Sequence, residues 1–149
     1  MIFRNVDRKG WDPSLATYEG EGGYDPLKKG MKMPAADVHA EVKKSGVRGR
    51  GGAGFPAGVK WGFIPPDNEK PVYLICNADE SEPGTFKDRY ILHQDPHQLI
   101  EGMVLSAYSV GAHVAYIYIR EEFPEAAQIL EKAIEEARAK NYVGKNIQG

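Results

Sequence analysis

Three stretches of the chain repeat apolar residues at the spacing of an amphipathic helix. They cover residues 35–45, 95–111 and 124–140, and the last has glutamates early and basic residues late. Gly46 and Gly111 follow the first two stretches, where a residue in the left-handed conformation can end a helix. The pattern therefore predicts three substantial helices.

Local end signals refine these helices. Asp95 is a suitable N-cap, and Gln98 stands at the position that closes a capping box. Pro56 fits the first turn of a further short helix that would end near Trp61 or Phe63.

Two short apolar runs read as strands. They are residues 71–76 (PVYLIC) and 114–119 (VAYIYI), and each is continuous enough for a buried parallel strand. The order strand, helix, strand, helix predicts an α/β fold with a parallel sheet flanked by helices. Two strands alone make a marginal sheet, and a third strand would be expected after residue 149. We therefore expect a partial sheet, with the third strand onward missing.

The N-terminal residues 1–34 differ from the rest. They carry scattered glycine, proline and charge, with Trp11 and Tyr18 as isolated apolar anchors. We predict an irregular arm with one short helix near residues 25–29, which needs another surface to lie against.

Composition narrows the function classes. The 149 residues carry a formal net charge of -2, with 42% apolar and 27% charged residues, and no polybasic run points to nucleic acid or a membrane surface. No apolar run is long enough to cross a bilayer, and the N-terminus lacks a signal-peptide core, so we expect a soluble intracellular protein. The single cysteine, Cys76, cannot by itself hold a disulfide or an iron–sulfur cluster. The four histidines lack metal-ligand spacing, and no metal site built on histidine or cysteine is expected.

A glycine-rich loop follows the first helix. Gly49, Gly51 and Gly54 match a G-x-G-x-x-G spacing, but a helix rather than a strand precedes them, which argues against an ordinary Rossmann fingerprint. Dense glycine lets backbone N–H groups converge on an anion and lets a flat ring approach closely. Nearby cations that suit such a ligand are Arg48, Arg50 and Lys60, and nearby aromatic residues are Phe55, Trp61 and Phe63. A tight loop without a ligand is the alternative.

An acidic loop follows the first strand. Its polar side chains include Asn77, Asp79, Glu80 and Glu82. Ligands of open α/β sheets sit at the carboxyl ends of the strands, where carboxylates can accept hydrogen bonds from ribose hydroxyls. Pairing with Arg48 or Arg50 and binding of Mg²⁺ or Ca²⁺ remain equal alternatives.

These two loops carry a resemblance to a known family. Residues 45–61 (SGVRGRGGAGFPAGVKW) and 77–89 (NADESEPGTFKDR) resemble the two signatures of the NADH-binding flavoprotein subunit of respiratory complex I. The same signatures occur in diaphorase subunits of NAD-reducing hydrogenases and NAD-linked formate dehydrogenases. On this resemblance, residues 35–149 are the N-terminal half of a non-Rossmann domain that binds FMN and NAD(H).

The resemblance also implies roles for individual residues. Those that would contact FMN are Gly49, Arg50, Gly51, Gly52 and Lys60, with Asn77, Asp79 and Glu80 at the ribityl chain and ring edge. Those that would face NADH are Phe55, Lys60, Phe63 and Glu82, and Glu82 is the candidate catalytic residue. NADH would give a hydride to FMN, which releases single electrons to iron–sulfur clusters.

The family pattern is incomplete in this chain. Ala57 replaces a usual threonine and Val59 a common leucine, both mild departures. The family continues with a Tyr-Ile-Cys-Gly-Glu-Glu-Thr stretch, a β-grasp-like domain and a helical domain whose four cysteines hold a [4Fe–4S] cluster, and none of these is present.

The resemblance also implies partners and a location. The expected partners are a thioredoxin-like [2Fe–2S] subunit and a larger iron–sulfur subunit, with no nucleic acid and no direct membrane insertion. The expected location is peripheral, on the cytoplasmic or matrix face of the membrane. The alternatives are a non-catalytic module that binds FMN or anions, and an inert fragment.

Overall fold

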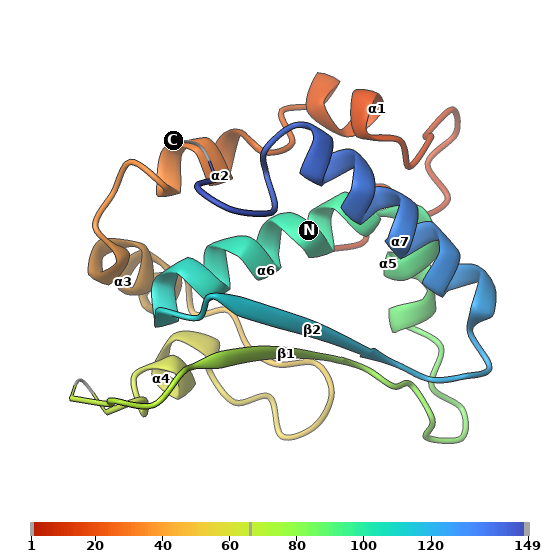
Figure 1. Ribbon diagram of the computed structural model, residues 1–149. Coiled ribbons are helices and arrows are strands. Elements are labelled where there is room, and N and C mark those ends of the chain that lie inside the picture. Colours follow the sequence, from red (N-terminus) through yellow and green to blue (C-terminus); the bar gives the residue numbers. More distant parts are fainter. Residues whose placement is uncertain (1, 66, 148–149) are drawn as a thin grey trace.

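The fold is one small parallel sheet with helices packed mainly against one of its faces (Figure 1). The structure is a computed structural model, and it describes residues 2–65 and 67–147. In chain order the elements are α1 (Leu15–Gly20), α2 (Asp25–Gly30), α3 (Ala35–Ser45), α4 (Ala57–Trp61), β1 (Tyr73–Ala78), α5 (Asp88–Gln94), α6 (Pro96–Val110), β2 (Val114–Ile119) and α7 (Pro124–Ala139). No helix within these described ranges combines the length and apolarity needed to span a membrane.

The sheet confirms the predicted parallel pairing. Strands β1 and β2 pair from Tyr73 opposite Val114 to Ala78 opposite Ile119. The first strand starts two residues later than predicted and runs on to Ala78. Helices α5 and α6 connect the two strands, and α7 follows β2 and returns above the same face (Figure 1). The opposite face carries exposed apolar side chains: Tyr73, Ile75, Val114, Tyr116 and Tyr118.

The three long helices form as predicted, with one correction at a helix start. Gly46 and Gly111 end α3 and α6 in the left-handed conformation, at φ 67° and 70°. Asp95 is the N-cap residue of α6, but its side chain makes no capping hydrogen bond. The predicted capping box is wrong because the buried Asp95 carboxylate accepts from Asn5 Nδ2 (2.8 Å) and Gln98 Nε2 (2.5 Å) instead.

The N-terminal segment is held firmly against α6 and α7. The short helix expected near residues 25–29 is α2, whereas α1 was missed within the arm predicted to be irregular. Glu101 of α6, only 6% exposed, accepts hydrogen bonds from Tyr18 Oη, Tyr24 N and Leu27 N. Tyr24 also stacks on Tyr142, at 3.9 Å between ring centroids. The arm therefore finds the surface that its sequence requires.

His97 lies in the middle of this contact and is 1% exposed. Its Nδ1 lies 3.0 Å from Tyr24 Oη, and its Nε2 lies 3.1 Å from Glu136 Oε2. A neutral ring with its proton on Nε2 satisfies both contacts, because Tyr24 then donates to Nδ1 and Nε2 donates to Glu136. Burial lowers the pKa of His97, and the opposing effect of Glu136 does not restore it.

This geometry predicts an acid-sensitive contact. A histidine whose pKa is lowered on folding contributes stability above its unfolded pKa of about 6.5, and loses it as the pH falls through the folded value. Between about pH 7 and about pH 5, the wild-type free energy of unfolding should fall by on the order of 1 kcal/mol more than that of His97→Gln. Urea unfolding at the two pH values measures this. His113→Gln, at an exposed site, is the control and should keep the wild-type slope. An identical slope in His97→Gln would contradict a neutral buried ring.

Candidate cofactor site

The glycine-rich loop is closed at its neck by backbone pairing. Arg48 and Pro56 form an isolated antiparallel bridge, with Gly49 N donating to Phe55 O (3.0 Å) and Ala57 N donating to Val47 O (2.9 Å). The Arg48 guanidinium donates to Gly54 O at 3.1 Å and braces the loop from within. The loop is thus a shaped turn, which extends below the strands and away from α6 in the view of Figure 1.

The tip of this loop presents unused hydrogen-bond donors. Among the described residues, the backbone N–H groups of residues 50–54 donate to no other group. A Cβ atom built on Gly51 or Gly52 would meet nothing within 4 Å, so open space lies in front of the backbone. A run of exposed N–H groups on a braced turn suits an oxyanion, and the absence of side chains lets a bulky ligand approach.

Cationic and aromatic side chains lie beside the loop because α4 packs tightly on α3. A Cβ atom on Gly58 would lie 2.5 Å from Lys43 Cα, and His39 Nε2 lies 2.6 Å from Gly58 O. This packing leaves the rings of Phe55 and Phe63 at 5.8 Å between centroids, 47% and 69% exposed.

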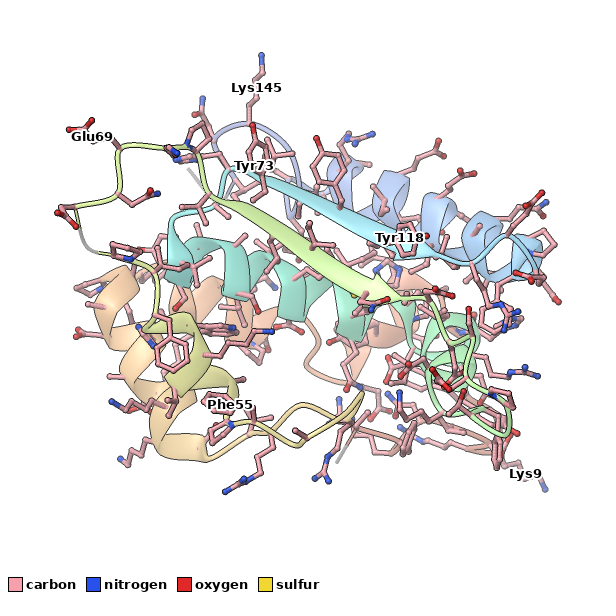
Figure 2. All side chains as sticks on the ribbon, turned by 90° about the horizontal axis from the view of Figure 1, so that it is seen from below. Lys9, Phe55, Glu69, Tyr73, Tyr118 and Lys145 are labelled. Atoms are coloured by element: carbon pink, nitrogen blue, oxygen red, sulfur yellow. The ribbon has the colours of Figure 1, made fainter. Side chains whose placement is uncertain are left out.

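Figure 2 looks onto the open face of the sheet and shows Phe55 beside α4 and the glycine-rich loop. The side chains of Arg50 and Lys60 are exposed and form no ion pair within the described part of the chain. This short segment therefore offers both exposed aromatic rings and cationic groups without an ion-pair partner in the described residues.

The acidic loop leaves the carboxyl end of β1. Asn77 Oδ1 accepts from Asp79 N at 3.0 Å, and Asp79 in turn accepts from the Ser81 hydroxyl. Glu82 is exposed, and its carboxylate has no hydrogen bond or ion pair among the described residues. The loop therefore offers oxygen acceptors at the edge where ligands of open α/β sheets bind.

Glu80 is turned the other way, into the protein. It is 4% exposed, and its carboxylate accepts from the backbone N–H groups of Lys87, Asp88 and Arg89, at 2.8, 2.8 and 3.2 Å. These groups begin α5, so Glu80 acts as its capping carboxylate. Burial alone would raise the pKa of Glu80, but the three N–H donors and the Lys87 ammonium outweigh it and hold the pKa below its ordinary value.

Two features of this region were not predicted from sequence. Helix α5 was missed, and so was Arg120, which follows β2 and donates to Glu80 O at 2.7 Å. Arg120 thus ties the loop after β1 to the end of β2. In the described residues no ion pair joins the acidic loop to Arg48 or Arg50, and no cluster of three or more potential ligands could hold a metal.

Comparison with known proteins gives a consistent result. Residues 42–148 match the family model Complex1_51K, described as the Nuo51 FMN-binding domain. An F-type subunit of NADH-quinone oxidoreductase from Rhizobium meliloti is 53% identical over 150 residues, which is all of this chain and 35% of that protein. The F-type subunit of NADH-quinone oxidoreductase from Aquifex aeolicus is 55% identical over 136 residues, or 91% of this chain and 32% of that protein.

A solved structure gives the same fold. The NAD⁺-reducing [NiFe]-hydrogenase in the air-oxidized state superposes with a TM-score of 0.65 at 40% sequence identity, over 87% of this chain and 23% of the matched chain. This chain therefore spans about a third of the length of its curated relatives. The family model covers most of the chain, including both loops, and the chain belongs to the Nuo51 FMN-binding domain family.

Proposed function

We propose that this chain is the FMN- and NADH-binding part of an NADH dehydrogenase flavoprotein subunit. The observation that carries the proposal is the braced glycine loop, whose N–H groups at residues 50–54 have no partner in the described chain. Membership in the FMN-binding family supports it, and so do relatives named as F-type subunits of NADH-quinone oxidoreductase.

The glycine loop would bind the flavin. The N–H groups of the loop would hold the FMN phosphate, with Arg50 and Lys60 neutralising its charge. Gly49, Gly51 and Gly52 would let the flavin approach the backbone, since the space in front of Gly51 and Gly52 is open.

The acidic loop would complete the flavin site from the other side. Asn77 and Asp79 would accept hydrogen bonds from the ribityl hydroxyls. Glu80 would act indirectly, because its carboxylate is already used by the start of α5 and fixes the loop that carries its neighbours.

The nucleotide would lie over the flavin, beside the aromatic pair. Phe55 and Phe63 are exposed enough to stack on the adenine ring, Lys60 can meet the pyrophosphate, and Glu82 can accept hydrogen bonds near the reacting end. FMN, when bound, supplies a group that can accept two electrons together as a hydride and release them one at a time. The chain's own residues bind and orient the two partners, with Glu82 as the candidate catalytic residue.

Membership in the family extends the proposal to the partners and the location of the whole protein. The whole protein would pass electrons to iron–sulfur clusters, including a [4Fe–4S] cluster whose ligands are not in this sequence. Its partners would be a thioredoxin-like [2Fe–2S] subunit and a larger iron–sulfur subunit, in a complex on the inner face of the cell membrane. A diaphorase subunit of an NAD-reducing hydrogenase is the second candidate, supported by the 40% identical hydrogenase chain.

Titration with FMN tests the proposal. Flavin fluorescence and the flavin retained after gel filtration should give one FMN per chain, and loss of flavin absorbance on adding NADH should then report reduction. Binding without reduction would support a flavin-binding module that lacks hydride transfer. A folded chain that retains no FMN at saturating concentration would contradict the proposal.

A further inference from the structure

Arg120 joins the acidic loop to the turn between β2 and α7, at the end of the sheet where both strands end (Figure 1). Its Nη1 donates to Glu80 O at 2.7 Å. Its Nε donates to Glu122 Oε2 at 3.0 Å, and its Nη2 lies 2.9 Å from Glu122 Oε1, so the two side chains form a bidentate ion pair. Every guanidinium nitrogen thus has a protein partner, which suits a side chain that holds the loop rather than one that contacts a ligand.

A fixed base supports the Arg120 guanidinium. Its Cζ lies 5.3 Å from the centroid of the Phe123 ring, and Phe123 packs against a buried cluster that includes Ala78 and Leu92. Phe123 N also donates to Arg120 O at 3.1 Å, which closes the turn before α7. The hydrogen bond from Arg120 lowers the pKa of Glu122 to about 2, so this carboxylate stays ionised near neutral pH. The guanidinium is therefore held from its own side before it reaches the loop.

Glu80 is the fixed point of the acidic loop, because it is bound at both its side chain and its backbone. The first N–H groups of α5 bind its carboxylate, and Arg120 binds its carbonyl. Asp79 comes directly before this point. Its N–H donates to Asn77 Oδ1 at 3.0 Å, and its carboxylate accepts from the Ser81 hydroxyl. A hold on the Glu80 carbonyl therefore fixes the backbone that carries the Asp79 carboxylate.

The charge of Arg120 acts on the same loop. The pKa of Arg120 is raised, chiefly by its hydrogen bond with Glu122 and further by the charges of Asp79 and Glu80. Neighbouring carboxylates repel each other, and a cation close to both of them offsets this repulsion. Arg120 thus favours a loop conformation in which both carboxylates stay close to the end of β2.

We propose that Arg120 is a positioning residue of the cofactor site, which holds the Glu80 carbonyl and so sets where the Asp79 carboxylate meets the ribityl chain of FMN. This inference rests on the proposed function, in which Asp79 accepts hydrogen bonds from the ribityl hydroxyls. Groups of a binding site must be held within about 0.5 Å of the productive geometry. Release of the Glu80 carbonyl would move Asp79 out of that range and weaken the binding of FMN.

Arg120→Gln removes the contact with the loop selectively. The glutamine amide ends where arginine has Nε, which meets Glu122, and lacks the Nη1 that meets Glu80. The dissociation constant of FMN should rise about fivefold or more in this variant, with wild-type helical content by circular dichroism. If Arg120→Gln does not fold, Arg120→Met replaces it, because its apolar side chain can still cover Phe123.

Two further variants separate positioning from a general structural role. Arg120→Lys restores a charged donor that can reach a single carbonyl, and it should bind FMN within about twofold of the wild type. Arg89→Gln is the matched control, because Arg89 Cζ also lies 5.3 Å from the Phe123 ring but its exposed guanidinium has no hydrogen bond or ion pair among the described residues. FMN affinity should stay at the wild-type value in this control.

Amide hydrogen exchange of the chain without FMN tests the hold on the loop by itself. Exchange of the Asp79 amide should speed up about tenfold in Arg120→Gln, whereas the paired amides of Tyr73–Ala78 should keep their wild-type rates. Arg120→Lys and Arg89→Gln should exchange as the wild type does at Asp79.

The outcomes distinguish this inference from the proposed function. Wild-type FMN binding together with unchanged affinity in Arg120→Gln would overturn the inference alone. An equal loss of affinity in Arg120→Lys and Arg120→Gln would overturn it too, because a donor to the Glu80 carbonyl would then not be what matters. A folded wild-type chain that retains no FMN would overturn the proposed function, and the positioning role would fall with it.

Discussion

Replacing Gly52 by leucine is expected to reduce FMN affinity at least tenfold, or by about 1.4 kcal/mol, without unfolding the chain. A Cβ atom at Gly52 meets nothing within 4 Å, and the residue has no positive φ, so the loop tolerates a side chain. The same open space is where the flavin would approach the backbone N–H groups. The new side chain therefore competes with the ligand rather than with the fold. Fluorescence titration with FMN measures the loss.

Gly102→Leu provides the matched control. Gly102 lies on an exposed position of α6 with nothing within 4 Å of its built Cβ atom, far along the chain from the glycine loop. FMN affinity should be unchanged in this variant. Gly52→Leu should unfold within about 0.5 kcal/mol of the wild type, whereas Gly102→Leu should be more stable by up to about 1 kcal/mol, because leucine favours the interior of a helix over glycine. Wild-type FMN affinity in Gly52→Leu would argue that the flavin does not approach this loop.

Replacing Glu80 by alanine is expected to lower the free energy of unfolding by about 2–3 kcal/mol. The change leaves three backbone N–H groups at the start of α5 without their buried acceptor. Because the pKa of Glu80 is held below its ordinary value, its contribution is present above the unfolded pKa and is lost as the pH falls through the folded value. Urea unfolding near neutral pH and again near pH 4 should show the difference between wild type and variant shrinking in acid.

Glu82→Ala separates this structural role from a nucleotide role. Glu82 is two residues away and exposed, with no side-chain partner in the described chain. Its removal should leave stability within about 0.5 kcal/mol of the wild type while weakening NADH binding. Equal stability losses in Glu80→Ala and Glu82→Ala would show that Glu80 does not cap α5.

The predicted elements are those whose signals are local. Helix α3 forms over the predicted residues and ends at Gly46, because the apolar spacing and the end signal lie within one short stretch. Both strands and their parallel pairing followed from apolar runs separated by a long helix. Helix α1 was missed although a local signal for it exists. Ser14 is its N-cap residue, and the Ser14 side chain accepts a hydrogen bond from Thr17 N.

The other missed features depend on contacts between residues that are further apart in the chain. Helix α5 begins where Glu80 accepts its first N–H groups, seven to nine residues away across a turn. The predicted capping box at Asp95 does not form, because the Asp95 carboxylate accepts a hydrogen bond from Asn5, which lies ninety residues earlier in the chain. Such contacts cannot be predicted from the periodicity of apolar residues or from local residue spacing.

The candidate site also contains one part that could be predicted from local sequence signals and one part that could not. The glycine loop could be predicted, since glycine density and neighbouring cations are local properties of the sequence. The different orientations of Glu80 and Glu82 could not, because two neighbouring acidic residues of the same loop look alike until α5 is in place. The assignment of these residues to FMN and NADH stays a prediction.

Amide NMR of the ¹⁵N-labelled chain during an FMN titration shows residue by residue whether the glycine loop binds the flavin. We expect the largest shifts on the backbone amides of residues 50–54, whose N–H groups have no partner in the described chain, with smaller changes at Asn77 and Asp79. Large shifts confined to the cavity that Met103 of α6 and Ala127 of α7 help to line, or no shifts at saturating FMN in a folded chain, would contradict it.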